Sequence, residues 1–275
     1  MNTMRTVMLM TLLTLVLVGA GGALGGQSGA LIALIMAGVM NLGTYWFSDK
    51  VVISMYRGQE TSSGTLYEVV SELCQQNSLV MPRVYVLPQQ TPNAFATGRN
   101  PQHAVVAATE GIMQILSREE LKGVMAHELA HVQNRDILIG SIAATIAGAI
   151  SWLAHMAQWA MIFGGSDDED QNPIAMIAMM ILAPIAAMLV QMAISRSREY
   201  AADAGGAKYC GNPHALASAL RKLEMSNQRM PMRKVNEATA HMFIVNPLSG
   251  QKMAQLFSTH PPMAERIRRL EEMRF

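Results

Sequence analysis

The residues best suited to chemistry lie in the run His-Glu-Leu-Ala-His, which contributes His127, Glu128 and His131. On an α-helix, positions i and i+4 share one face, so both imidazoles can bind a single zinc ion. Glu128 then lies beside the metal without binding it. A carboxylate there can take a proton from a metal-activated water and pass it to the leaving amine of a peptide. The pattern therefore indicates metal-assisted hydrolysis of a peptide bond.

Two signals independent of that motif predict a helix here. Ser117 followed by Glu120 forms a capping box, and apolar residues recur with helical period at Leu121, Val124, Met125, Leu129 and Val132. The alternative is a surface helix that carries two histidines by chance. Because residues 123–130 are otherwise apolar, burying an unpartnered His-Glu pair among them would be costly. The metal site is therefore the favoured interpretation.

A catalytic zinc usually has three protein ligands and one open position, so a further ligand must come from elsewhere in the chain. The best candidate is Glu199, which follows directly on a long apolar segment. Asp203 lies one helical turn later and can accept the second N–H of a zinc-bound histidine. On spacing alone, Glu199 is equally well explained as an exposed acid paired with Arg196 or Arg198.

The composition points to a membrane. Of the 275 residues, 51% are hydrophobic and 15% are charged, whereas soluble domains carry about 25% charged residues. The formal net charge of +1 provides no basic field for nucleic acid, which we exclude as a partner. The two cysteines, Cys74 and Cys210, indicate reduced, buried thiols rather than a disulfide framework.

Two hairpins of membrane-spanning helices are predicted. Residues 6–48 carry no charge, and glycine-rich residues 19–29 divide them into two halves long enough to span a bilayer. We therefore assign residues 1–48 to a first transmembrane hairpin. A cleaved signal peptide is the alternative for the first half, but a second span that follows at once favours retention.

The second predicted hairpin covers residues 137–195, with the acidic run 167–170 between its two apolar segments. Lysine and arginine cluster at the opposite ends, which predicts that both termini and the metal helix face the cytoplasm. His155 lies within the third span. It marks either a functional site or, as we favour, a neutral and hydrogen-bonded histidine.

The remaining segments, residues 49–136 and 196–275, are the predicted halves of one catalytic domain. Short β-prone runs at 83–87 and 104–107 predict a small sheet. Between them, residues 92–98 form either an edge strand, in which Asn93, Ala94 and Phe95 contact an extended peptide, or an ordinary turn. The expected fold class is a mainly α membrane protein, with four transmembrane helices and an α+β domain.

His260 precedes two prolines that open a final helix. Its imidazole could donate a hydrogen bond to the oxyanion of the tetrahedral intermediate. The alternative is that His260 only orients the final helix.

These motifs together resemble the HtpX-type membrane zinc metalloproteases, which are relatives of the CAAX prenyl endoprotease. The resemblance includes the run 127–131 with Asn134-Arg135-Asp136, the later Ser-Arg-x-Arg-Glu-Tyr-x-Ala-Asp, residues 92–98 and Thr-His-Pro-Pro at 259–262. It extends over the whole chain and is highly specific.

The resemblance implies a bacterial inner-membrane endoprotease with a cytoplasmic, gluzincin-like site. Its substrates would be misfolded or damaged membrane proteins, cleaved in quality control and the stress response. By that likeness, His127, His131 and Glu199 bind one zinc ion per chain, and Glu128 is the general base.

Two other functions are compatible with such a sequence. One is a zinc-bound scaffold without proteolytic activity, against which the intact Glu128 argues. The other is a zinc-dependent hydrolase of a lipid or prenylated substrate at the bilayer surface.

Overall fold

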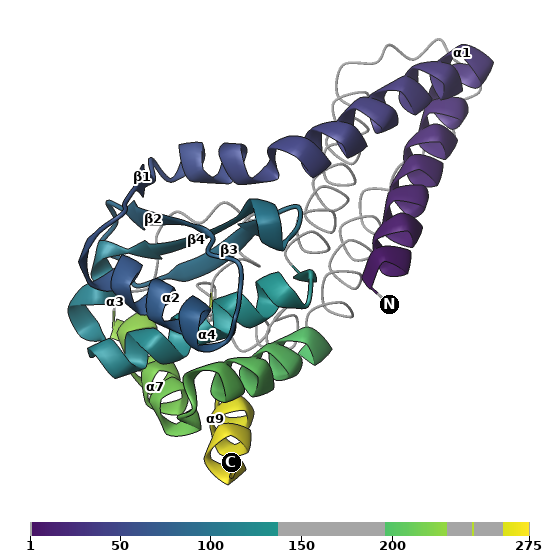
Figure 1. The fold of residues 1–275 in the computed structure, drawn as a ribbon. Helices are drawn as coiled ribbons and strands as arrows, with labels where there is room; N and C mark the ends of the chain where they lie inside the picture. The colour runs from purple at the N-terminus through teal and green to yellow at the C-terminus, as the bar shows by residue number, and fades with distance from the viewer. Residues whose placement is uncertain (1, 137–195, 230–243, 245–260, 275) are drawn as a thin grey trace.

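The computed structural model describes residues 2–136, 196–229, 244 and 261–274 (Figure 1). The predicted second hairpin, with His155, and the predicted oxyanion donor His260 lie outside these described residues. The described part consists of a long amino-terminal helix and an α+β body that carries the candidate catalytic residues.

The amino-terminal helix α1 runs from Asn2 to Met55 and folds back on itself within the glycine-rich segment (Figure 1). Gly26 has a φ of +58°, a left-handed conformation that glycine adopts without strain. A Cβ on Gly21 would lie 2.5 Å from the carbonyl oxygen of Gly29, so the two arms touch through backbone. The bend falls within the predicted turn. Among the described residues, one segment, Gly26–Phe47, has the length and mean hydropathy (1.6) of a membrane span.

A four-stranded mixed sheet forms the centre of the body. Its strands are β1 (Gln59–Glu60), β2 (Arg83–Leu87), β3 (Ala94–Gly98) and β4 (Ala104–Thr109), in the order β1-β2-β4-β3. β2 and β4 are parallel, and the other pairs are antiparallel. The structure confirms both predicted β-prone runs. Among the described strands β3 lies at the edge of the sheet, as the edge-strand alternative for residues 92–98 predicted, and peptide binding there stays a prediction.

The helices of the body are α2 (Gly64–Gln76), the short α3 (Glu110–Ile115), α4 (Arg118–Gln133), α7 (Pro213–Arg229) and α9 (Met263–Glu272). Residues 196–210 form a further helix, which Figure 1 draws without a label. The predicted capping box is present: the Ser117 hydroxyl accepts from the Glu120 N–H, and the Glu120 carboxylate accepts from the Ser117 N–H. It starts α4 at the expected residue.

The main core lies between the sheet and the helices, where α2 and α7 pack on α4 and α9 packs on α7 (Figure 1). Its fully buried members include Leu73, Val106, Leu129, Leu216 and Leu220. The opposite side of the sheet carries a smaller apolar cluster, built on Tyr85, Leu87 and Phe95. Val52, Ile53 and Tyr56 from the last turns of α1 pack against that cluster. The sheet therefore joins the amino-terminal helix to the helix that carries the His-Glu-x-x-His motif.

Candidate active site

The motif helix α4 is buried along almost its whole length, so its polar residues are withdrawn from solvent. His127 is 1% exposed and Glu128 is 5% exposed. The Nε2 atoms of His127 and His131 lie 3.2 Å apart, because one helical turn places both rings on the same face. This is the arrangement that the spacing of the motif predicted.

The helix at residues 196–210 packs closely on α4 and brings Glu199 to the two histidines. Close approach depends on Gly206, where a Cβ would lie 2.7 Å from the backbone nitrogen of His127. The carboxylate of Glu199 lies 3.7 Å from Nε2 of His127 and 3.5 Å from Nε2 of His131. Glu199 is buried, and the alternative of an exposed surface acid is wrong.

The separations of these three groups suit a zinc ion. Two ligands that each lie about 2.0–2.1 Å from a tetrahedral zinc are roughly 3.3 Å apart. The three pairs here are separated by 3.2, 3.7 and 3.5 Å. In the part of the chain that the structure describes, this is the one group of three or more potential ligand side chains close enough to share an ion. The donor set of two imidazoles and one carboxylate is also one that zinc takes in hydrolases.

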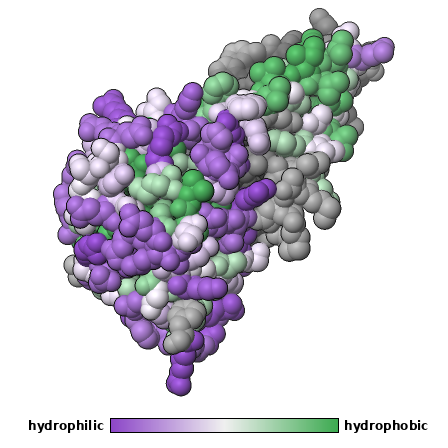
Figure 2. All heavy atoms as spheres, viewed as in Figure 1, coloured by the Kyte–Doolittle hydropathy of each residue, from purple (hydrophilic) through white to green (hydrophobic). Residues whose placement is uncertain are grey.

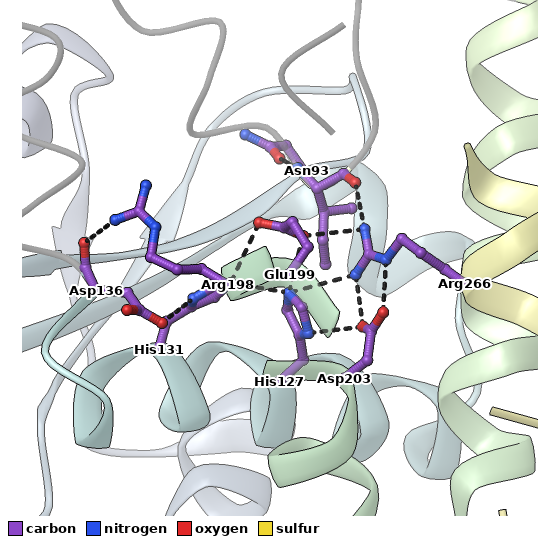
Figure 3. Close-up of polar contacts among 9 residues, drawn as sticks. Asn93, His127, His131, Asp136, Arg198, Glu199, Asp203 and Arg266 are labelled. Atoms are coloured by element: carbon purple, nitrogen blue, oxygen red, sulfur yellow. Dashed lines mark hydrogen bonds and ion pairs between the residues drawn. The ribbon is translucent and has the colours of Figure 1, made fainter. Parts of the chain in front are cut away.

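Two carboxylates orient the imidazole rings (Figure 3). Nδ1 of His127 lies 3.0 Å from Asp203, and Nδ1 of His131 lies 3.1 Å from Asp136. Each ring therefore turns its Nε2 toward the common centre, as metal-binding histidines do when the other nitrogen donates to an acid. Asp203 lies where the sequence placed it. Asp136 was not predicted as a site residue, although it closes the Asn-Arg-Asp run three residues after α4.

Arg266 is a second residue of the site that the sequence did not predict. It is 0% exposed and donates through Nε and Nη2 to both carboxylate oxygens of Asp203, at 2.8 and 2.7 Å (Figure 3). Its Nη1 lies 3.2 Å from Glu199. One guanidinium thus links the acid that orients His127 to the candidate third ligand. The available signal was an arginine within the apolar stripe of α9, beside Met263, Ile267 and Leu270.

Burial raises the pKa of the Glu128 carboxyl to about 7, and the nearby Glu199 acts in the same direction. A group with a pKa near neutrality is well suited to accept and return a proton. For Asp203, burial would raise the pKa, but Arg266 holds it down at about 2. The acid that faces His127 is therefore ionised at neutral pH.

His131 binds a proton tightly in the absence of metal. Burial would lower its pKa, but hydrogen bonds to Asp136 and Glu199 raise it to about 10. The same carboxylates that favour the imidazolium would favour a metal cation in its place. The site is therefore built for positive charge at its centre.

The edge strand β3 runs past the motif helix. The backbone N–H of Ala96 donates to the Glu128 carboxylate, which places the middle of β3 beside the candidate base. Asn93 is buried, and its side chain accepts a hydrogen bond from the N–H of Ile244 at 3.3 Å. Ala94 packs in the main core, whereas Phe95 packs on the other side of the sheet, against Tyr85. The structure therefore gathers the residues assigned to peptide binding near the site, with their side chains turned into the core.

Comparisons with known proteins found matches over most of the chain. The model of peptidase family M48 matches residues 60–274. A protein described as a protease HtpX homolog from Syntrophotalea carbinolica is 74% identical over 276 residues, covering 99% of each chain. Another of that description, from Persephonella marina, is 57% identical over 281 residues, covering 99% of this chain and 98% of its own.

Among solved structures, the crystal structure of Ste24p from S. mikatae superposes with a TM-score of 0.53 at 20% sequence identity. The match covers 88% of this chain and 58% of the Ste24p chain. At that identity the likeness concerns the fold alone, here the described helices with the small mixed sheet.

Proposed function

Because this chain belongs to peptidase family M48 and is a metalloprotease, we propose that it is a zinc-dependent endopeptidase of a bacterial inner membrane. It removes misfolded or damaged membrane proteins by cleaving them at the cytoplasmic face. The observation that carries this proposal is the convergence of His127, His131 and Glu199 at the separations of zinc ligands, with Glu128 next to them. One zinc ion per chain is expected.

In this proposal Glu128 performs the proton transfers. The bound zinc supplies a Lewis acid that polarises the scissile carbonyl and lowers the pKa of water. Glu128 takes a proton from the attacking water and delivers it to the nitrogen of the leaving amine. Its buried position supports both steps, because a carboxylate that is withdrawn from water accepts a proton more readily. Asp203 and Asp136 keep the imidazoles in the orientation that the metal requires.

The substrate peptide is proposed to pair with β3 as an additional strand. The carbonyl of Asn93 accepts from the N–H of Thr109 in β4 at 2.9 Å. Since backbone groups alternate in an antiparallel pair, those of Ala94 and Ala96 point away from β4, toward the open edge. Of the three residues assigned to peptide binding, Ala94 would then bind the substrate through its backbone. Asn93 and Phe95, whose backbone groups face β4, would hold the strand in place.

Exposed apolar side chains support membrane insertion of α1. Leu31, Ile35 and Val39 are 60, 61 and 66% exposed, and only 6% of the span Gly26–Phe47 is buried inside the protein. Figure 2 shows hydrophobic residues gathered on this arm and hydrophilic residues over the body. A bilayer would cover that surface. With residues 137–195 as the second hairpin, the chain would cross four times, with both termini in the cytoplasm.

His260 is proposed to donate to the oxyanion of the tetrahedral intermediate. Pro261, the next residue, is buried, and α9 starting at Met263 places Arg266 in the site. We expect His260→Ala to lower turnover about a hundredfold while zinc content and thermal stability stay unchanged. A parallel loss of stability would assign His260 to the support of α9.

A cleavage assay tests the proposed activity. Purified full-length protein in lipid vesicles, loaded with zinc, is mixed with an unfolded membrane protein, and the fragments are identified by mass spectrometry. Internal cleavage that a chelator stops and zinc restores is the expected result. Hydrolysis of the vesicle lipid without peptide cleavage would favour the lipid hydrolase instead.

A further inference from the structure

A cavity lies on the side of the body where α1 meets the sheet, apart from the residues assigned to catalysis. It has a volume of about 470 Å³, and its walls include residues 45–47, 49 and 50 of α1. The facing wall comes from the strands and the turn after β3, with Arg83, Arg99 and His103. Small-molecule sites are typically cavities of about 300–1,000 Å³. The cavity is thus large enough for a headgroup-sized ligand.

Two cations of this cavity lie over aromatic rings. The guanidinium of Arg99 stacks over the ring of Trp46 at 4.2 Å, and the ammonium of Lys50 lies 5.7 Å from the ring centre of Phe47. Within residues 2–136, 196–229, 244 and 261–274, neither cation forms an ion pair with an acid. The third cation, Arg83, is paired with Asp49 at 2.6 Å. Three cations and one acid leave two positive charges, which a negatively charged ligand would balance.

The cavity is also at the correct depth for a lipid headgroup. Tyr45, Trp46 and Phe47 lie at the end of the candidate span Gly26–Phe47, and Trp46 and Phe47 are 50 and 53% exposed. Tyrosine and tryptophan prefer the interface between the bilayer and water. In Figure 1, α1 continues from this point across the body. With α1 inserted as proposed, the cavity would lie at the level of the lipid phosphates.

We propose that this cavity binds the phosphate of an anionic phospholipid, with Arg99 and Lys50 as its two contacts. The inference rests on the proposed membrane insertion of α1. The stacked Arg99 is held in place by Trp46 and presents N–H groups in the fork geometry that phosphate oxygens accept. Gln102 and His103 are exposed at the same cavity and supply polar groups for the alcohol portion of the headgroup. A zwitterionic lipid would bring its own cation and would be bound less tightly.

The test uses full-length protein purified in detergent and titrated with phosphatidylglycerol or phosphatidylcholine, with bound lipid counted by native mass spectrometry. The variant is Lys50→Gln with Arg99→Gln. Its matched control is Lys208→Gln with Arg274→Gln, which removes the same charge from exposed positions that do not line the cavity. Soluble glycerol phosphate and inorganic phosphate serve as competitors. Flotation with phosphatidylcholine vesicles separately tests membrane insertion.

We expect phosphatidylglycerol to bind more tightly than phosphatidylcholine, and the double variant to weaken phosphatidylglycerol binding roughly 25-fold, at about fivefold per cation. The control variant should bind as the native chain does. Equal weakening of lipid binding in the two variants, or no preference for the anionic lipid, would refute the proposed phosphate site. The aromatic residues would then only anchor α1 at the bilayer surface. Competition by inorganic phosphate at equal concentration would identify a free-anion site instead. Failure to float with vesicles would refute the membrane insertion on which the inference rests.

Discussion

At the scale of single residues, Arg266 changes how the candidate metal site is understood. Removing a buried cation leaves its acids uncompensated, which usually costs about 3–5 kcal/mol. Here the acids are Glu199, the proposed third zinc ligand, and Asp203, which orients His127. A zinc ion would partly balance the same carboxylates. Arg266 therefore contributes most to the stability of the fold when the metal is absent.

We predict that Arg266→Gln lowers the free energy of unfolding of the metal-free protein by about 3–5 kcal/mol. The loss should be smaller in the zinc-saturated protein. Thermal unfolding with and without zinc measures both values. Arg268→Gln is the control, because Arg268 pairs with Glu265 and Glu272 on the surface of the same helix. An equal loss with and without zinc would mean that Arg266 does not balance the metal site.

At the scale of elements, Glu120 joins the start of α4 to α7. Its carboxylate accepts from the Ser117 N–H at 2.8 Å, and from Ser218 and Lys222 at 2.7 Å each. Burial would raise the pKa of Glu120, but these bonds lower it to about 2, from 4.5 in the unfolded chain. The ionised group therefore stabilises the fold above about pH 4.5, and this contribution is lost as the pH falls toward 2.

We predict that Glu120→Gln costs about 1–2 kcal/mol near neutral pH, a value reduced because Lys222 is partly exposed to solvent. The difference between the variant and the native chain should shrink near about pH 3, because there the Glu120 carboxyl of the unfolded chain is protonated and unfolding takes up a proton. Chemical unfolding at the two pH values measures it. A pH-independent difference would mean that the hydrogen bonds, and not the charge, hold the two helices.

Local signals predicted the elements well. The capping box and the helical period marked α4, and β-prone residues marked β2 and β4. The order of strands depends on pairing between distant segments, which no local pattern contains. The bond between Arg266 and Asp203 spans 63 positions, so the sequence showed only an unexplained charge in an apolar stripe. The close packing of the helix at residues 196–210 on α4, at Gly206, could not be predicted for the same reason.

At the scale of the whole molecule, the proposed topology follows from the distribution of Lys and Arg. We predict that a cysteine introduced as Asp168→Cys reacts with an impermeant maleimide added outside intact cells. Lys208→Cys should react only after the inner membrane is opened. Both variants are made with Cys74 and Cys210 replaced by alanine, so that only the new thiol is labelled. The opposite labelling pattern would reverse the orientation and place the active site outside the cytoplasm.

His127, His131 and Glu199 are proposed to hold a zinc ion, while Glu128 only transfers protons. The most direct measurement compares zinc content and peptide-bond cleavage in the same preparations of the native chain and Glu128→Gln. We expect about one zinc per chain in both proteins and a fall in turnover of roughly a hundredfold or more in the variant. Equal turnover in the two proteins, or loss of zinc together with activity, would contradict the assignment.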